Sequence, residues 1–525
     1  MTEEGGGLSE AEQSAELGRE ISSGDADIVE DRTAIVALSW WQKPAQVTAM
    51  VSNFSTSYNV VNISLVLPIL EDLYEGTPED AAACASSLLA GMIVGQVVGG
   101  ALGDSFLGRL GALQLVMAIQ IVVSIGSAVS LWDNKTIYIG LAIWRFFLGI
   151  GAGAVYPLAA TLSAAQAETT RTSREELSPE DKVLQIKSVV LTFSMQGFGF
   201  LAVPLVALPL LHLTPETSLD IVWRLLLGFG CVPGLLLLFL QCHLYRSSRP
   251  ADLEAIPQAE PVHEDAIGEI IVDERHEPLI SREEEEEGSE EELPGDTESP
   301  SESPPGLWAS IKNEPNLIQK LLGTAGTWFL FDVLFYGNTL FQPIVMEAAF
   351  GGHDSDEDDV IKKAAMDSLF LGLIALPGYA VSALVIGKRF CYIMQTPRYV
   401  QLQGFLAMAM LYAIIGAYWS YLKRIPALLV ILYGMTFFFA NYGPNTTTFV
   451  FPSLVFSRDC RSTLNGISAA AGKAGALLGA TSFAPAATAL GDDKVMLICA
   501  GVSVVAFALT KCFTRVPSSN HTHRS

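Results

Sequence analysis

Cysteine and histidine are scarce in this chain, and those present are scattered. The 525 residues include seven of each. The cysteines show no CxxC or metal-like spacing, so we expect neither a disulfide framework nor a metal site. The chain also lacks a P-loop and a Ser/His/Asp array, which argues against an enzyme and gives no reason to expect a cofactor.

The N-terminus is polar and acidic up to Trp40, without a cleavable signal peptide, so the first apolar segment is expected to act as an uncleaved insertion signal.

Long apolar stretches dominate the remainder. Half of the residues are hydrophobic and the mean hydropathy is +0.38. A helix needs ~20 predominantly apolar residues to cross the hydrocarbon core of a bilayer. Candidate spans lie near 46–71, 84–104, 110–131, 137–164, 187–211, 221–245, 316–348, 365–386, 399–421, 426–448, 464–488 and 494–514. The pattern predicts an all-α polytopic membrane protein with twelve transmembrane helices, surrounded by the lipid bilayer.

The acidic residues are concentrated outside these spans. The net charge is −25, with an acidic N-terminal tail at 1–45 and an acidic segment at 246–315 that holds the unbroken run Glu283 to Glu287. Such a segment cannot bury enough apolar surface to fold, so 246–315 is expected to be disordered. It is either a solvated linker or the docking site of a cytoplasmic partner. The charge therefore gives no sign of a nucleic-acid partner and says little about the spans.

The acidic segment divides the spans into two sets of six, in residues 46–245 and 316–514, followed by a short tail at 515–525. Orientation follows from lysine and arginine, which are in excess in short cytoplasmic loops. The excess is found when both termini and the central loop are cytoplasmic. The inner loops then hold Arg109, Arg171, Arg174, Lys182, Lys187, Lys388, Arg389, Arg398, Arg458 and Arg461. We expect a multi-pass protein of the plasma membrane, with an internal membrane as the alternative.

A weak repeat relates the two halves. Gly103-Asp104 and Gly108-Arg109 follow the second span, and Gly387-Lys388-Arg389 follows the eighth. This loop between spans two and three, which reads GDSFLGR, together with the 6+6 arrangement, resembles the major facilitator superfamily, which implies two pseudo-symmetric six-helix halves. Asp104 and Arg109 are either gating residues or anchors that set the topology.

The seventh span carries the clearest chemical signal. Its Trp328, Asp332 and Tyr336 are spaced by four and therefore share one helical face. A carboxylate in the middle of a span costs about 2.5–3.5 kcal/mol even on the lenient insertion scale, so it is rarely idle. Lys473 lies two turns into the eleventh span and is the predicted partner of Asp332. The pair either belongs to a substrate site or holds two helices together.

Three further polar positions lie within spans. Arg145 is either an inner-end anchor or a charge that faces the bundle interior, where it would serve gating or coupling. In the tenth span, Gly443-Pro444 is expected to break the helix, so that Asn445 and the threonines after it bond an oxyanion. Gln196 adds a neutral amide in the fifth span.

At these positions the sequence resembles the phosphate:proton symporters of plants and fungi. The likeness is carried by the runs WRFFLGIGAGAVYPLAAT, GTAGTWFLFDVLFYG, NYGPNTTTFVFPSLVF and RSTLNGISAAAGKAGALLG, in that order. The resemblance implies transport of inorganic phosphate by alternating access, coupled to protons. It implies a substrate site midway between the halves, formed by Tyr156, Gln196, Trp328, Asp332, Tyr336, Asn445 and Lys473.

Several positions depart from that family, and each lacks a titratable residue that the family has. They are Thr56 and Asn59 in its D-x-Y-D run, Gln114, Val155, Leu454 and Asn465. A proton relay needs titratable groups, so coupling is in question. Because the resemblance makes the acid replaced by Val155 the counter-charge of Arg145, this arginine would favour an anion instead. The hypotheses are phosphate uniport or exchange, or a symport that depends on Asp332 alone.

Two further functions stay open. One is transport of another solute, such as an organic phosphate, another organic anion or a sugar, because one fold serves many substrates. The other is a transport-inactive phosphate receptor whose acidic loop recruits a partner.

Overall fold

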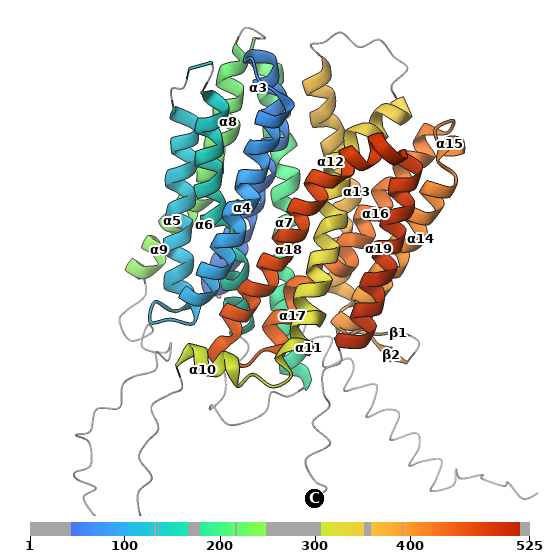
Figure 1. Ribbon diagram of the computed structural model, residues 1–525. Coiled ribbons are helices and arrows are strands. Elements are labelled where there is room, and N and C mark those ends of the chain that lie inside the picture. Colours follow the sequence, from blue (N-terminus) through green and yellow to red (C-terminus); the bar gives the residue numbers. More distant parts are fainter. Residues whose placement is uncertain are drawn as a thin grey trace, which may run out of the picture.

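The computed structural model describes residues 44–130, 133–134, 136–165, 179–215, 218–247, 306–350, 359–390 and 392–514. The predicted tails 1–45 and 515–525 and most of the acidic loop lie outside these residues, except for positions 44 and 45 and the two ends of the loop. The described chain forms two helical bundles that stand side by side (Figure 1). The first, blue to green, is built from residues 44–247, and the second, yellow to red, from residues 306–514.

The first bundle contains six membrane-length segments. The first segment is α2 (Pro44–Val61) and α3 (Ile63–Leu73), which meet at Asn62. The sixth consists of α8 (Leu219–Gly228), the 3₁₀ turn η3 (Phe229–Cys231) and α9 (Val232–Ser247). The four between are single helices: α4 (Pro78–Gly103), α5 (Gly108–Val129), α6 (Ile137–Ala165) and α7 (Pro179–Leu213).

The second bundle repeats this plan with two interruptions. Its first segment runs from α11 (Leu317–Leu321) through the π-helical turn η5 (Leu322–Gly326) into α12 (Thr327–Phe350). Its fourth runs from α16 (Pro426–Ala440) through the π-helical turn η6 (Asn441–Asn445) into α17 (Thr446–Val455). The others are α13 (Asp359–Val385), α14 (Pro397–Ala417), α18 (Arg461–Leu490) and α19 (Asp492–Phe513).

Short elements connect these helices. They are α10 (Leu307–Lys312), α15 (Trp419–Leu422), η7 (Arg458–Cys460), and the antiparallel strands β1 (Arg389–Phe390) and β2 (Ile393–Met394). The two strands pair Arg389 with Met394 and so close the turn after α13.

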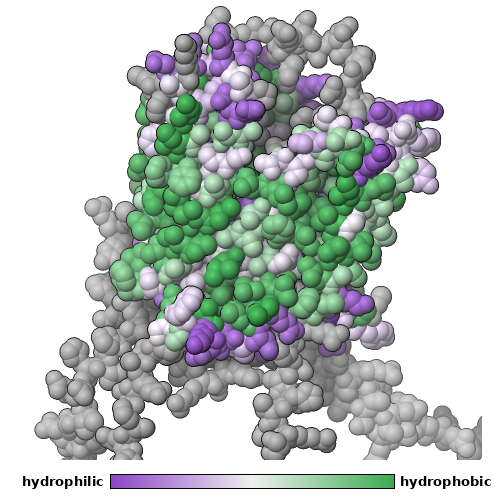
Figure 2. Space-filling view, in the orientation of Figure 1, coloured by the Kyte–Doolittle hydropathy of each residue, from purple (hydrophilic) through white to green (hydrophobic). Residues whose placement is uncertain are grey.

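All twelve predicted spans coincide with these segments, although the segments differ from one another in length and in their number of charged residues. Within the described residues, nine helices are individually long and apolar enough to cross a membrane. The first, seventh and eleventh segments are not among these nine. The face in Figure 2 shows a band of hydrophobic side chains between two hydrophilic ends, as expected for a protein embedded in a bilayer.

The predicted disorder of 246–315 extends too far at both ends. At the start, α9 continues to Ser247, and at the end α10 packs its Leu307 and Ile311 against a cluster around Phe456 and Leu464. The sequence-based boundary was wrong because the acidic composition of the segment masked this short apolar stretch.

The two bundles meet closely at the end that carries α10 and the Asp104 loop, which we call the inner end, following the positive-inside prediction. A Cβ atom built on Gly100 of α4 would lie 2.5 Å from the carbonyl oxygen of Ser462 on α18. One built on Gly466 would lie 2.2 Å from the carbonyl oxygen of Gln96. Real Cβ atoms never approach so closely, so glycine at both positions permits this crossing of the two backbones.

Candidate functional site

Lys473 joins the polar residues of α12 to α18. Its Nζ atom lies 2.9 Å from Oδ2 of Asp332 and 2.9 Å from the hydroxyl oxygen of Tyr336. The side chains of Lys473 and Asp332 are each 3% exposed. The predicted ion pair is thereby confirmed, and it is buried, so each charge depends on the other for its stabilisation.

One residue of the first half reaches this cluster. The Nζ atom of Lys473 lies 5.4 Å from the ring centroid of Tyr156 on α6 and 4.3 Å from that of Tyr336. Both distances fall within the range of a cation–π contact. The cluster therefore spans the boundary between the two bundles.

Close packing of α12 on α18 sets this geometry. A Cβ atom on Gly475 would lie 2.1 Å from the carbonyl oxygen of Phe329, and one on Gly472 would lie 2.5 Å from Cδ1 of Trp328. Gly472 therefore leaves the space that the Trp328 indole occupies beside Lys473. The small residues of α18, which lower its hydropathy, bring the helices close enough for the pair to form.

An aromatic cluster links the predicted residues from different helices. The ring of Phe449 on α17 has its centroid 6.1 Å from Tyr156 and 6.4 Å from Trp328. It also lies 4.5 Å from Phe193 on α7, which in turn lies 5.9 Å from Tyr379 on α13. Neither Phe449 nor Tyr379 was predicted as part of the site, because a single aromatic residue in an apolar span carries no distinct signal.

Asn445 belongs to the same region but already has partners. Its Nδ2 atom donates to the hydroxyl of Tyr379 at 2.9 Å and to Oδ1 of Asn441 at 2.7 Å. Gln196 on α7 is 3% exposed, and its Oε1 atom has no hydrogen-bond partner among the described residues. Its neighbour Gly197 abuts Tyr379, which puts Gln196 beside α13.

At Gly443-Pro444 the α-helix is interrupted, as expected, but the chain does not leave the helical path. The chain continues as the π-helical turn η6, and the threonines after it bond carbonyls of their own helix. The Oγ1 atom of Thr446 donates to Asn441 O at 2.6 Å, that of Thr447 to Gly443 O at 2.9 Å, and that of Thr448 to Pro444 O at 2.7 Å. The three hydroxyls donate to their own helix in this conformation, so binding of an oxyanion by these threonines stays a prediction that would require them to exchange these bonds.

Arg145 is not an end anchor, because it is completely buried. Its guanidinium donates to the carbonyls of Asn59 and Val60 at 3.0 and 3.2 Å and to Oδ1 of Asn62 at 2.9 Å. These groups lie where α2 gives way to α3, so Arg145 satisfies carbonyls at that junction. A carboxylate at position 155 of the same helix would lie about 15 Å away along its axis, too far for the expected ion pair.

The positions where the related family has its first-span aspartates form a neutral network. Thr56 and Gln120 bond each other at 3.2–3.3 Å, and Nδ2 of Asn59 donates to the carbonyl of Gly230 at 3.1 Å. Ser124 donates to Oδ1 of Asn59 at 3.3 Å. The amide and hydroxyl groups at these positions thus bond one another, and none of these groups titrates near neutral pH.

The predicted gating residues lie at the inner end. Asp104 accepts bonds across the bundles from the backbone N–H of Ser462 at 3.2 Å and of Thr463 at 2.7 Å, and from the Thr463 hydroxyl at 2.9 Å. Arg109 donates to the carbonyl of Arg458 at 3.4 Å. Asp104 therefore holds the start of α18 to the end of α4, and Arg109 holds the start of α5 to η7.

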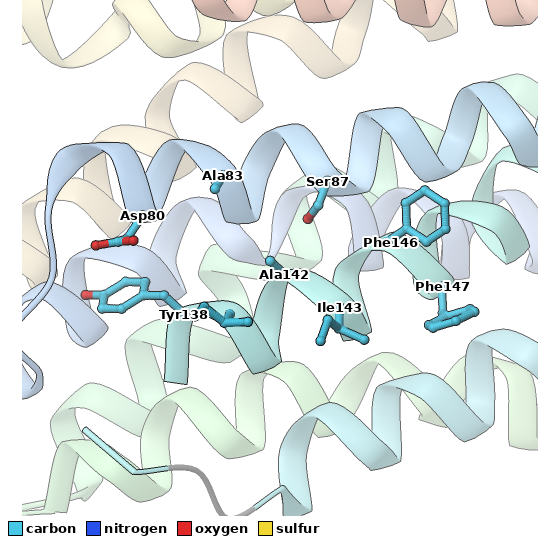
Figure 3. A pocket seen from close by; sticks show the side chains of 9 residues that line it. Asp80, Ala83, Ser87, Tyr138, Ala142, Ile143, Phe146 and Phe147 are labelled. Carbon is cyan, nitrogen blue, oxygen red and sulfur yellow. The ribbon is translucent and has the colours of Figure 1, made fainter. Parts of the chain in front are cut away.

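A separate groove lies between α4 and α6, near the opposite end from Asp104 (Figure 3). It has a volume of about 480 Å³, and its walls include Tyr138, Phe146 and Phe147. Ile139 and Ile143 on its rim are largely exposed. The groove opens on the surface of the first bundle and contains none of the predicted site residues.

Among the described residues, no group of three His, Cys, Asp or Glu side chains is placed to hold a metal ion.

Comparison with known proteins identifies the family of the chain. Residues 49–480 match the model of the Major Facilitator Superfamily. The chain is 30% identical over 522 residues to "Probable inorganic phosphate transporter 1-6" of Arabidopsis thaliana, covering 93% of each protein. It is 31% identical over 487 residues to "Low affinity inorganic phosphate transporter 1" of Petunia hybrida, covering 86% of this chain and 84% of the relative.

Solved structures show the same fold at low sequence identity. The xylose transporter XylE from E. coli superposes with a TM-score of 0.57 at 17% identity, covering 90% of this chain and 97% of that structure. The human organic anion transporter MFSD10 gives 0.54 at 15% identity, covering 89% and 100%. The chain belongs to the major facilitator superfamily and, within it, to the family of the plant inorganic phosphate transporters.

Proposed function

We propose that this protein is a secondary transporter that moves inorganic phosphate across a membrane by alternating access. One observation carries the proposal. Lys473, Asp332 and Tyr336 of the second half form a buried polar cluster that faces Tyr156 of the first. A ligand held there touches both halves, as alternating access about a central site requires. The names of the relatives point to phosphate as the ligand.

The cluster suits a tetrahedral oxyanion that keeps a proton. Lys473 donates to Asp332 and Tyr336, and on binding it can turn one donor to a phosphate oxygen. Asp332 then accepts the hydrogen bond of a P–OH group. Phosphate carries such a group near neutral pH and sulfate does not, so the carboxylate repels sulfate and accepts phosphate. The indole of Trp328 and the hydroxyl of Tyr156 add neutral donors that hold the ion without preventing its release.

The contacts at the inner end indicate which state of the transport cycle the described conformation represents. Asp104 ties the start of α18 to the loop after α4, and the two helices cross closely at Gly100 and Gly466. Opening a path on that side requires breaking these bonds, so we infer that the described state is closed toward the inner end.

The neutral network around Thr56 and Asn59 bears on coupling. Among the described residues, the buried carboxylates are Asp332 and Glu314, and Glu314 lies outside the spans. We infer that phosphate moves by exchange or uniport, or by a symport in which Asp332 alone carries the proton. An imposed pH gradient across proteoliposomes distinguishes these: steep dependence of net uptake on the gradient favours the symport, and its absence favours exchange or uniport.

Uptake of radiolabelled phosphate by cells without their own phosphate carriers tests the proposed function. The intact chain is expected to support uptake, and Asp332→Asn to abolish it at equal abundance in the membrane. Asp72→Asn, a substitution of an exposed acid at the end of α3, is the matched control and should leave uptake unchanged. If the intact chain gives no uptake, or Asp332→Asn transports normally, the proposal is wrong. Competition by organic phosphates, other organic anions and sugars tests the alternative substrates.

The membrane itself is part of this proposal. We propose the plasma membrane, with an internal membrane as the alternative. Labelling of intact cells with an impermeant reagent that reacts with a tag inserted after Asp133, in an exposed outer loop, tests both the location and the orientation.

A further inference from the structure

Two side-chain amides are buried without partners where the halves cross. Gln96 on α4 and Asn465 on α18 are both completely inaccessible. Neither amide nitrogen nor amide oxygen of either residue has a hydrogen-bond partner among the described residues. Gln46, Asn53 and Asn338 each leave only an oxygen unpaired, because their nitrogens donate.

The two residues occupy corresponding places on facing helices. The backbones of α4 and α18 touch at Gln96 and Gly466, the residue after Asn465. Asn465 precedes Lys473 by eight residues and Gln96 precedes Asp104 by eight, which is about 12 Å along each helix axis. The amides therefore lie between the buried Lys473–Asp332 pair and the bonds that Asp104 makes at the inner end.

A structural role does not account for these amides. A buried amide that makes no hydrogen bond lowers stability, and an apolar side chain of the same shape would be better tolerated. Buried unpaired polar groups in a native protein call for an explanation, and a ligand that passes between the halves supplies one. Below them the polar lining continues, because Thr161 of the first half and Ser462 of the second bond each other at 3.0 Å.

We propose that Gln96 and Asn465 form a second, transient binding station for phosphate on its path between the central site and the inner end. The inference rests on the proposed function. Each amide offers two N–H donors for the oxyanion and one oxygen that accepts from a P–OH group, which suits phosphate with its proton. Neither is charged, so the ion is held weakly and moves on. Because each half supplies one amide, separation of α4 from α18 dismantles the station and releases the ion.

The test uses the full chain in proteoliposomes and the double variant Gln96→Met, Asn465→Leu, which keeps side-chain volume and removes both amides. We expect exchange of radiolabelled phosphate to slow about tenfold. The equilibrium Kd for inorganic phosphate, measured on the purified protein, should stay unchanged, because the central site is intact. The Tm should stay unchanged or rise, since no hydrogen bond is lost.

Asn338→Leu is the matched control, because it removes an equally buried amide inside the second half, where its nitrogen donates to Leu334 O. It should lower the Tm and leave exchange unchanged. If the double variant exchanges phosphate at the normal rate, or loses equilibrium binding as well, the station does not exist. If the double variant does not fold, the amides are structural and the inference is equally wrong. The single variant Gln96→Met repeats the exchange test. Failure of the intact chain to exchange phosphate would contradict the proposed function instead.

Discussion

Lys473 and Asp332 are 141 positions apart in the chain, yet their charged atoms lie 2.9 Å from each other inside the protein. Both side chains are 3% exposed. Removing one partner of such a pair leaves an uncompensated buried charge, which typically costs about 3–5 kcal/mol, whereas replacing both with apolar residues can be neutral.

This relationship predicts the outcome of a double-mutant cycle. Lys473→Met and Asp332→Leu should each lower the free energy of unfolding by about 3–5 kcal/mol, and the double variant should recover most of the loss. Phosphate uptake should be absent in all three, because the site is gone. Thermal unfolding in detergent and uptake in cells give the two readouts. Recovery of uptake in the double variant would show that the pair only holds the helices together.

Gly472 is expected to be necessary for the position of Trp328. In Gly472→Ala the new methyl would lie 2.5 Å from Cδ1 of the indole, so the ring must move. We expect the Kd for phosphate to rise about tenfold, equivalent to about 1.4 kcal/mol. Gly501→Ala in α19 is the control, since no atom lies within 4 Å of a Cβ there. Isothermal titration with phosphate compares them, and equal affinities in the two variants would contradict the assignment of Trp328 to the site.

Asp104 should bias the protein toward the state closed at the inner end. Asp104→Asn keeps the shape but removes the charge and replaces one of the two oxygens that accept from the backbone N–H groups of Ser462 and Thr463 with an NH2 donor. Hydrogen bonds to charged groups contribute about 1.5–3 kcal/mol. We expect the distance between spin labels at positions 105 and 459 to shift to a longer population. Asp133→Asn, in an exposed outer loop, is the control. An unchanged distance distribution would show that Asp104 does not hold the inner end closed.

Because of Glu314, acidification should weaken the packing of the segment that follows α10, whereas a rise in pH above neutral should not. Its carboxylate bonds Lys320 and the backbone N–H of Ser457. Burial raises the pKa of Glu314, but these bonds lower it by more, so the net pKa lies below its usual value. A lowered pKa in the folded state adds stability above the usual glutamate pKa of about 4.3, and this stability is lost as the pH falls through the lowered value.

Glu314→Gln tests this effect. It should lower the Tm by a constant amount from about pH 6 to 8, and the difference from the unsubstituted protein should shrink below about pH 4. Asp459→Asn, at an exposed position in η7 close in sequence to Ser457, should show no such pattern. A difference that grows on acidification would reverse the sign of the argument.

The functional differences from the related family are partly visible in the sequence and partly not. The absence of aspartate at Thr56 and Asn59 is plain from the chain alone. Their replacement by a network with Gln120 and Gly230 is not, because it depends on which helices are neighbours. Arg145 illustrates the same limit: its type and span were evident, but its carbonyl partners at the junction of α2 and α3 were not.

The sequence by itself determined the membrane class, the twelve spans, the division into halves and the face of α12 that carries Trp328, Asp332 and Tyr336. Hydropathy and helical spacing are local properties, so they can be read along the chain. The tertiary structure decided which polar groups bond one another and which are left without a partner among the described residues. It gave the threonine hydroxyls after η6 to their own helix, placed Phe449 and Tyr379 beside the site, and left the amides of Gln96 and Asn465 unpaired. Those outcomes depend on how closely two helices approach. Glycines that are distant in sequence set this distance, because they allow two backbones to come together.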